Sequence, residues 1–171
     1  MTRDGVKGLL ADMEPEAEQL ALPAAYGSPD RLLLWADVEQ RLVDATVYWL
    51  ATTQSDGSPH VVPVDGMWLD GAAWFGGHPS TRHTRNLRDN PRAVLHLENG
   101  SSALIVHGVA AVHVPDDAGA ERLAATAKAK YGYGQPASTY REGVWRLAPV
   151  KVLAWNELHR DATRFRFADQ A

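Results

Sequence analysis

Two Asp-Gly pairs, at positions 56–57 and 70–71, divide one stretch of the chain into short apolar runs. The runs are Val47–Thr53, His60–Val64 and Ala72–Phe75, and each is rich in β-branched or other apolar residues. Asp-Gly between such runs is typical of tight β-hairpins, because both residues tolerate the positive φ angles that these turns need. The stretch therefore predicts consecutive antiparallel hairpins, most simply a β-meander.

The second half of the chain continues this pattern of short strands. The expected strands are Ala93–Glu98, Ala103–Val114, Gly143–Leu147, Lys151–Asn156 and Thr163–Phe167. Asn99-Gly100 separates the first two and favours a turn with positive φ. The sheet is therefore expected to continue in the antiparallel sense.

Helix signals lie on both sides of these strands. Ser28-Pro29-Asp30 is typical of a helix start, and Asp116–Tyr131 reads as an Ala- and Lys-rich helix that Gly132 ends. Residues 1–27 are polar and weakly patterned, which predicts an N-terminal arm with room for one helical piece. Residues 28–171 are then expected to form one α+β domain with a mainly antiparallel sheet.

The strand that ends at Phe75 leads into a cluster of hydroxyl and basic side chains. The cluster follows Gly76-Gly77 and consists of Ser80, Thr81, Arg82, His83 and Arg85. It falls on the predicted first turn of a short helix that ends before Pro91. Free N–H groups and the positive end of the helix dipole suit a phosphate there. The alternative is a solvated basic helix face with no ligand.

Four motifs in this region carry a family resemblance: YWLAT, PHVVPV, the pattern S-x-R-[KH]-x-R-N-L, and NPRAVL. Their order and spacing resemble the pyridoxamine 5′-phosphate oxidase-like, or flavin/deazaflavin oxidoreductase, superfamily, and above all its actinobacterial branch that uses coenzyme F420. The likeness extends over about residues 31 to 167. It implies an FMN-binding-type split β-barrel with flanking helices.

The resemblance also implies roles for single residues. In the family, the Arg matched by Arg82 binds the cofactor phosphate together with a following Lys, which here is His83. A histidine carries charge only when protonated, so phosphate affinity is expected to depend on pH. The resemblance places the backbone of Val62, Pro63 and Val64 against the ring system of the cofactor.

Two further residues enter through the partner subunit of the family's homodimer. A C-terminal aromatic residue and an Arg of the neighbouring chain close the cofactor cleft there, and the matching positions are Trp155 and Arg164. The strands Met67–Leu69 and Lys151–Trp155 are expected to carry more apolar surface than a small barrel buries, which favours a dimer.

The implied activity is hydride transfer between a bound cofactor and a small organic substrate. Coenzyme F420 is favoured over FMN, and no catalytic side chain is identified. True pyridoxamine phosphate oxidation is disfavoured, because no second phosphate-binding cluster is recognised. The alternatives are a non-catalytic flavin carrier, a barrel that binds haem or another tetrapyrrole, and a structural dimer whose site has decayed.

Composition excludes several other classes. The chain has no cysteine, which rules out disulfides and thiolate metal sites, and its seven histidines show no metal-binding spacing. A net charge of −4 argues against nucleic-acid binding. Because neither a membrane-length apolar run nor a signal-peptide core is present, a cytoplasmic protein is expected.

Overall fold

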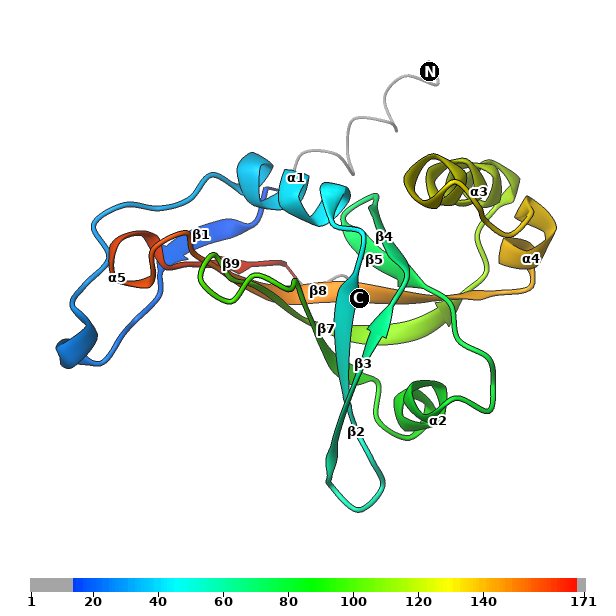
Figure 1. Ribbon diagram of the computed structural model, residues 1–171, viewed down its shortest axis with the longest axis horizontal. Coiled ribbons are helices and arrows are strands. Elements are labelled where there is room, and N and C mark those ends of the chain that lie inside the picture. Colours follow the sequence, from blue (N-terminus) through cyan, green and yellow to red (C-terminus); the bar gives the residue numbers. More distant parts are fainter. Residues whose placement is uncertain (1–13, 169–171) are drawn as a thin grey trace.

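One antiparallel sheet organises the fold, which the computed structural model describes for residues 14–168 (Figure 1). Along the sheet the strands follow the order β1-β9-β8-β7-β6-β2-β3, and the β4–β5 hairpin joins it through β8. The strands are β1 (Glu16–Gln19), β2 (Tyr48–Thr53), β3 (Pro59–Val64), β4 (Gly66–Leu69), β5 (Ala72–Phe75), β6 (Arg92–His96), β7 (Leu104–His113), β8 (Val144–Ala154) and β9 (Thr163–Arg166).

Five α-helices and one short 3₁₀-helix flank this sheet within residues 14–168 (Figure 1). They are α1 (Trp35–Asp44), α2 (Arg82–Asp89), α3 (Asp117–Tyr131), α4 (Ala137–Arg141), α5 (Leu158–Asp161) and the 3₁₀-helix Ala24–Tyr26. The α3 prediction is confirmed: Asp116 caps it by accepting a hydrogen bond from the Gly119 N–H at 2.7 Å, and Gly132 ends it with a φ of 73°. The fold as a whole is the expected α+β split barrel.

Both Asp-Gly turns form, but the strands between them do not make a meander. Asp70 and Gly71 have φ angles of 52° and 67°, as a tight hairpin requires. β3 pairs with β2, whereas β5 pairs with β4 and β8 and not with β3. All four residues of β5 are buried, so this strand requires packing partners on both of its faces. The chain therefore leaves the β2–β3 hairpin after β3 and places β5 elsewhere in the sheet. The missing pairing between β3 and β5 is the break that makes the barrel a split barrel.

The core lies between the sheet and α1. Its fully buried side chains include Tyr48, Leu50, Phe75, Leu147 and Phe165. From α1, Val38 and Leu42 reach it at the helical spacing read from the sequence. Met67 and Trp68 are also buried, at 5% and 3% exposure, so the β4 strand does not supply the spare apolar surface that was expected of it.

The helix predicted from Ser28 is wrong in its starting point. Helix α1 begins only after Leu34, and residues 28–34 form an extended strap. The backbone N–H groups of Asp30 and Arg31 donate to the Arg160 carbonyl at 2.9 and 3.3 Å. These tertiary hydrogen bonds take the place of a first helical turn, and a local helix signal contains no information about them.

Two other local expectations also differ. Asn99-Gly100 adopts no positive φ; instead the Asn99 side chain accepts hydrogen bonds from the N–H groups of Ser101 and Ser102. The two strands predicted on either side of Pro149 form the single strand β8. A β-bulge opposite His107 and Gly108 in β7 accommodates the interruption.

Part of the predicted N-terminal arm belongs to the sheet. β1 pairs with β9, and Glu18 accepts hydrogen bonds from Arg164 and Arg166 at 3.1 and 2.6 Å. Residues 1–13 lie outside the described residues. Across residues 14–168, no helix is long and apolar enough to span a membrane.

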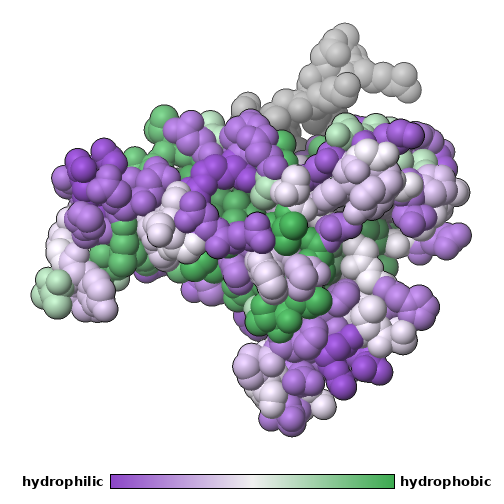
Figure 2. All heavy atoms as spheres, in the orientation of Figure 1, coloured by the Kyte–Doolittle hydropathy of each residue, from purple (hydrophilic) through white to green (hydrophobic). Residues whose placement is uncertain are grey.

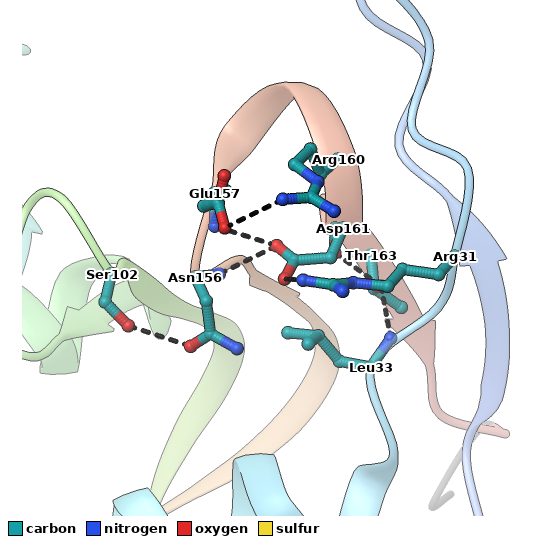
Figure 3. A network of polar contacts seen from close by, with 8 residues as sticks. All are labelled: Arg31, Leu33, Ser102, Asn156, Glu157, Arg160, Asp161 and Thr163. Atoms are coloured by element: carbon teal, nitrogen blue, oxygen red, sulfur yellow. Dashed lines mark hydrogen bonds and ion pairs between the residues drawn. The ribbon is translucent and has the colours of Figure 1, made fainter.

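A buried carboxylate fixes the strap to the β8–β9 connection (Figure 3). Asp161 has no exposed surface and accepts hydrogen bonds from the N–H groups of Asn156 and Glu157 at 2.8 and 2.9 Å. Its other oxygen pairs with Arg31 at 3.2 Å. Burial acts to raise the pKa of Asp161, but these hydrogen bonds and the charge of Arg31 outweigh it and hold the pKa below its ordinary value.

We expect this carboxylate to make the fold acid-sensitive. Because the pKa of Asp161 is lower in the folded chain than in the unfolded chain, the unfolded chain takes up the proton first, and stability is lost as the pH falls below about 4. Asp161→Ala is expected to lower the free energy of unfolding at pH 7 by about 2–4 kcal/mol, since it leaves buried donors without an acceptor. Urea unfolding between pH 7 and 3 measures both effects. The same acid dependence in Asp161→Asn and wild type would contradict this assignment.

Candidate functional site

The basic cluster lies at the start of α2, which follows the loop out of β5. Arg82 and Arg85 are exposed, as are the side chains of the preceding loop up to Ser80. Thr81 is the N-cap, but its hydroxyl accepts no hydrogen bond from a backbone N–H group of the first turn. The Thr81 hydroxyl instead donates a hydrogen bond to the His78 carbonyl at 2.8 Å. The first N–H groups of α2 therefore have no side-chain cap, which leaves them available to an anion.

His83 lies differently from the two arginines. It is only 8% exposed, and a Cβ added at Gly77 would come within 2.6 Å of its Nε2 atom. Burial lowers the pKa of His83 more than its hydrogen bond to the Gly76 backbone raises it, so the ring is neutral at pH 7. In this conformation His83 packs against the Gly76-Gly77 loop and stabilises it. Its expected charge-dependent contact with phosphate stays a prediction.

A chain of polar side chains holds α2 against the β2–β3 hairpin. The buried Asn86 amide donates to the Thr52 hydroxyl at 2.9 Å, and that hydroxyl lies 3.5 Å from Nδ1 of His60. Thr52 is on β2 and His60 is on β3, so the helix start is fixed relative to the strand that carries Val62 to Val64. His60 is connected to α2 through Thr52.

An open hollow of about 440 Å³ borders the end of β3. Its walls include Pro63 and Val64 of β3, Gly76 after β5, and Tyr131 and Tyr133 at the end of α3. A Cβ added at Gly76 would meet no described atom within 4 Å, so a ligand has room to approach the backbone there. Gly76 borders the hollow, and its backbone also accepts the hydrogen bond from His83, which lies at the start of α2. The hollow and the basic cluster are thus parts of one continuous surface.

The outer edge of β3 adds backbone groups to this surface. β3 is the last strand on its side of the sheet, and no described strand pairs with that edge. Its outward N–H and C=O groups remain available to a ligand, as the interruption by Pro63 suggested. Figure 2 shows hydrophobic surface along the central strands next to strongly hydrophilic surface over α2.

Trp155 and Arg164 lie far from this surface within one chain. Pairing across the sheet forms a single row, which we call the Pro63–Arg164 row: Pro63, Trp49, His96, Ile105, Leu153 and Arg164. Directly paired residues point to the same face. Five strand spacings of about 4.8 Å separate the two ends, roughly 24 Å. Trp155 follows Leu153 by two residues, at the Arg164 end of the row.

Some residues around the hollow were not singled out from the sequence. Asp65, which accepts a hydrogen bond from the Tyr133 hydroxyl at 2.6 Å, is one of them. Tyr131 is structural: its hydroxyl lies 2.6 Å from the Gly66 carbonyl and accepts from the Gly66 N–H at 2.9 Å. Only the folded chain brings α3 to the β3–β4 connection, so no local signal marked Asp65.

The donor set fits a cofactor with a phosphate and a flat ring. The uncapped helix start and two exposed arginines suit a phosphate. The apolar wall and free backbone of β3 suit a ring with carbonyls and nitrogens at its edge. Within residues 14–168, no group of His, Asp or Glu side chains could hold a metal ion. A second hollow at the other end of α3, lined by Trp74, Arg122 and Arg146 among others, shares no residue with this one.

Comparison with known proteins supports the sequence resemblance. The family model for pyridoxamine 5′-phosphate oxidase matches residues 34–156. No curated protein matches the sequence.

Solved structures share the fold at low sequence identity. The conserved hypothetical protein Rv2991 from Mycobacterium tuberculosis is 20% identical, with a TM-score of 0.62 over 75% of this chain and 88% of its own. An F420 reductase is 22% identical, with a TM-score of 0.51 over 66% and 94%. The haem storage protein HutZ from Vibrio cholerae is 19% identical, with a TM-score of 0.51 over 67% and 87%. At these identities the likeness establishes the fold and not the ligand.

Proposed function

Because the chain belongs to the pyridoxamine 5′-phosphate oxidase family, we propose that it is an oxidoreductase that transfers a hydride between a bound deazaflavin or flavin and a small organic substrate. The observation that carries this proposal is the continuity of the site. The uncapped start of α2, with exposed Arg82 and Arg85, meets the apolar hollow at Gly76. A phosphate and a ring joined by a linker need this combination of surfaces side by side.

Each part of the site has a distinct task in this proposal. Arg82 and the first N–H groups of α2 bind the phosphate, with Ser80 and Thr81 as neighbouring hydroxyls. The backbone of Val62, Pro63 and Val64 orients the ring and shields one of its faces from water. The bound cofactor supplies the hydride chemistry.

Between the two cofactors we propose coenzyme F420 ahead of FMN. The motifs PHVVPV and S-x-R-x-x-R-N-L support this choice, and one structural neighbour is an F420 reductase. Arg85 is exposed on α2, and an extra cation there would suit an acidic cofactor tail.

We also propose that the working unit is a homodimer. The Pro63–Arg164 row has half-buried apolar side chains at its centre, including Trp49, Ile105 and Leu153. Helix α2 contacts β2, but it does so through Thr52, which points to the other face of that strand. A twofold axis through the middle of the row would place Arg164 of the partner subunit opposite Pro63. The partner subunit's Trp155 and Arg164 would then complete a site that one chain leaves open.

A haem-binding protein is the second candidate, because HutZ shares the fold. The observation that favours it is a histidine on the exposed face: His96 stacks on Trp49 with ring planes 9° apart. Histidine is a common axial ligand of haem iron.

Titration of the purified protein separates these functions. We expect coenzyme F420 to bind with a dissociation constant at or below about 10 µM and FMN to bind less tightly, with haemin giving no ordered haem spectrum. Reduction or oxidation of the bound cofactor by a substrate panel then tests hydride transfer. Tight haemin binding that His96→Ala abolishes, together with no binding of either flavin-type cofactor, would replace the proposed function by the second candidate.

A further inference from the structure

The hollow beside β3 is lined by one acidic side chain and no basic one, which affects the charge of the substrates that it can bind. We infer that it selects flat substrates that are uncharged or positively charged and rejects anions, with Asp65 as the residue that sets this specificity. The inference rests on the proposed function, in which the ring lies along β3 and the substrate approaches from the hollow.

Asp65 is held in place at the edge of the hollow. It follows Val64 directly, and its carboxylate accepts the 2.6 Å hydrogen bond from Tyr133 on the loop after α3. This contact joins the two sides of the opening. The hydrogen bond to Asp65 raises the pKa of Tyr133, so the phenol keeps its proton and remains the donor.

None of the described side chains that line the hollow supplies a positive charge to balance this carboxylate. Among the described residues that line it, Asp65 is the single one with a carboxyl group, and none is Lys, Arg or His. Lys130 lies nearby, with its ammonium group 5.9 Å from the centre of the Tyr131 ring. It donates to the Tyr48 hydroxyl at 3.0 Å and is not part of the lining. Arg82 and Arg85 lie on α2, on the phosphate side of Gly76.

The remaining walls favour a flat, apolar molecule. Pro63, Val64 and Ala127 provide apolar surface, and the rings of Tyr131 and Tyr133 lie 5.7 Å apart on the opposite side. A hollow of about 440 Å³ is in the range that binds small organic ligands. A phosphate, sulfonate or carboxylate on such a ligand would be brought close to Asp65 without a compensating cation.

Three probes of matched shape and different charge test this inference. They are 2-naphthol, which is neutral at pH 7, naphthalene-2-sulfonate, which is an anion, and N-methylquinolinium, which is a cation. Equilibrium dialysis against the full-length protein, with and without coenzyme F420 or FMN, measures their affinities. We expect the sulfonate to bind at least tenfold more weakly than the other two.

Asp65→Asn should reduce this gap in affinity between the sulfonate and the other two probes to about threefold or less, chiefly by tightening sulfonate binding. Glu121→Gln is the matched control, because it removes the same charge from α3 ten residues before Tyr131, about 15 Å away along the helix, and it should leave the gap unchanged. If Asp65→Asn does not fold, raising the ionic strength from 20 to 500 mM tests the wild type, because screening should narrow the gap.

The inference is overturned if the sulfonate binds as tightly as 2-naphthol, or if neither Asp65→Asn nor added salt narrows the gap. Failure of the proposed function would look different. In that case neither cofactor would bind, whereas the order of the three probe affinities would still report the charge selectivity of the hollow.

Discussion

Arg82→Ala is expected to weaken cofactor binding by about 1.5–3 kcal/mol, or roughly 10- to 150-fold, without unfolding the protein. The guanidinium group is exposed at a helix start whose N–H groups lack a side-chain cap, so its loss removes a charged hydrogen bond to phosphate and creates no cavity. Titration with coenzyme F420 and with FMN measures the loss. Urea unfolding should give the same free energy for both proteins within about 0.5 kcal/mol.

Arg88→Ala is the matched control on the same helix. Arg88 is equally exposed but lies in the last turn of α2, where the negative end of the helix dipole does not favour an anion. Its replacement should change affinity less than threefold. Equal losses in the two variants would indicate a diffuse basic face, and an unchanged affinity in Arg82→Ala would move the phosphate to another site.

The parts of the fold that depend on local chemistry could be predicted from the sequence. Asp70-Gly71 forms a hairpin because these residues tolerate positive φ, and Asp116 caps α3 through its own side chain. The prediction of a helix that starts at Ser28 was wrong for the opposite reason. Tertiary hydrogen bonds to the β8–β9 connection override its local helix signal, and those partners are about 130 residues away.

The candidate site divides in the same way. The cluster from Ser80 to Arg85 is contiguous in sequence, so its placement on the start of α2 was predictable. That His83 turns inward depends on how the Gly76-Gly77 loop packs over it. Asp65 became a candidate only when the fold brought Tyr133 to it. Local motifs therefore predicted the basic side of the candidate site, while the hollow beside β3 required the tertiary structure.

Ile105→Arg is expected to convert a dimer into a monomer and to weaken cofactor binding at least 100-fold. Ile105 lies at the centre of the Pro63–Arg164 row, half-buried and next to Leu153 on β8. Two arginines facing each other across a twofold axis would bury like charges without partners, which few interfaces tolerate. Because Arg82 and Val62 to Val64 remain intact in this variant, lost affinity would have to come from the partner subunit's Trp155 and Arg164.

Val112→Arg provides the control for this substitution. Val112 is on the same strand but points to the other face, and it is 58% exposed. The change should therefore leave both assembly and cofactor affinity as they are. Light scattering with and without cofactor, combined with titration, measures the two properties on the same samples. A stable Ile105→Arg monomer that binds the cofactor with full affinity would refute the shared site, because the Arg164 end of the row lies roughly 24 Å from Pro63 in a single chain.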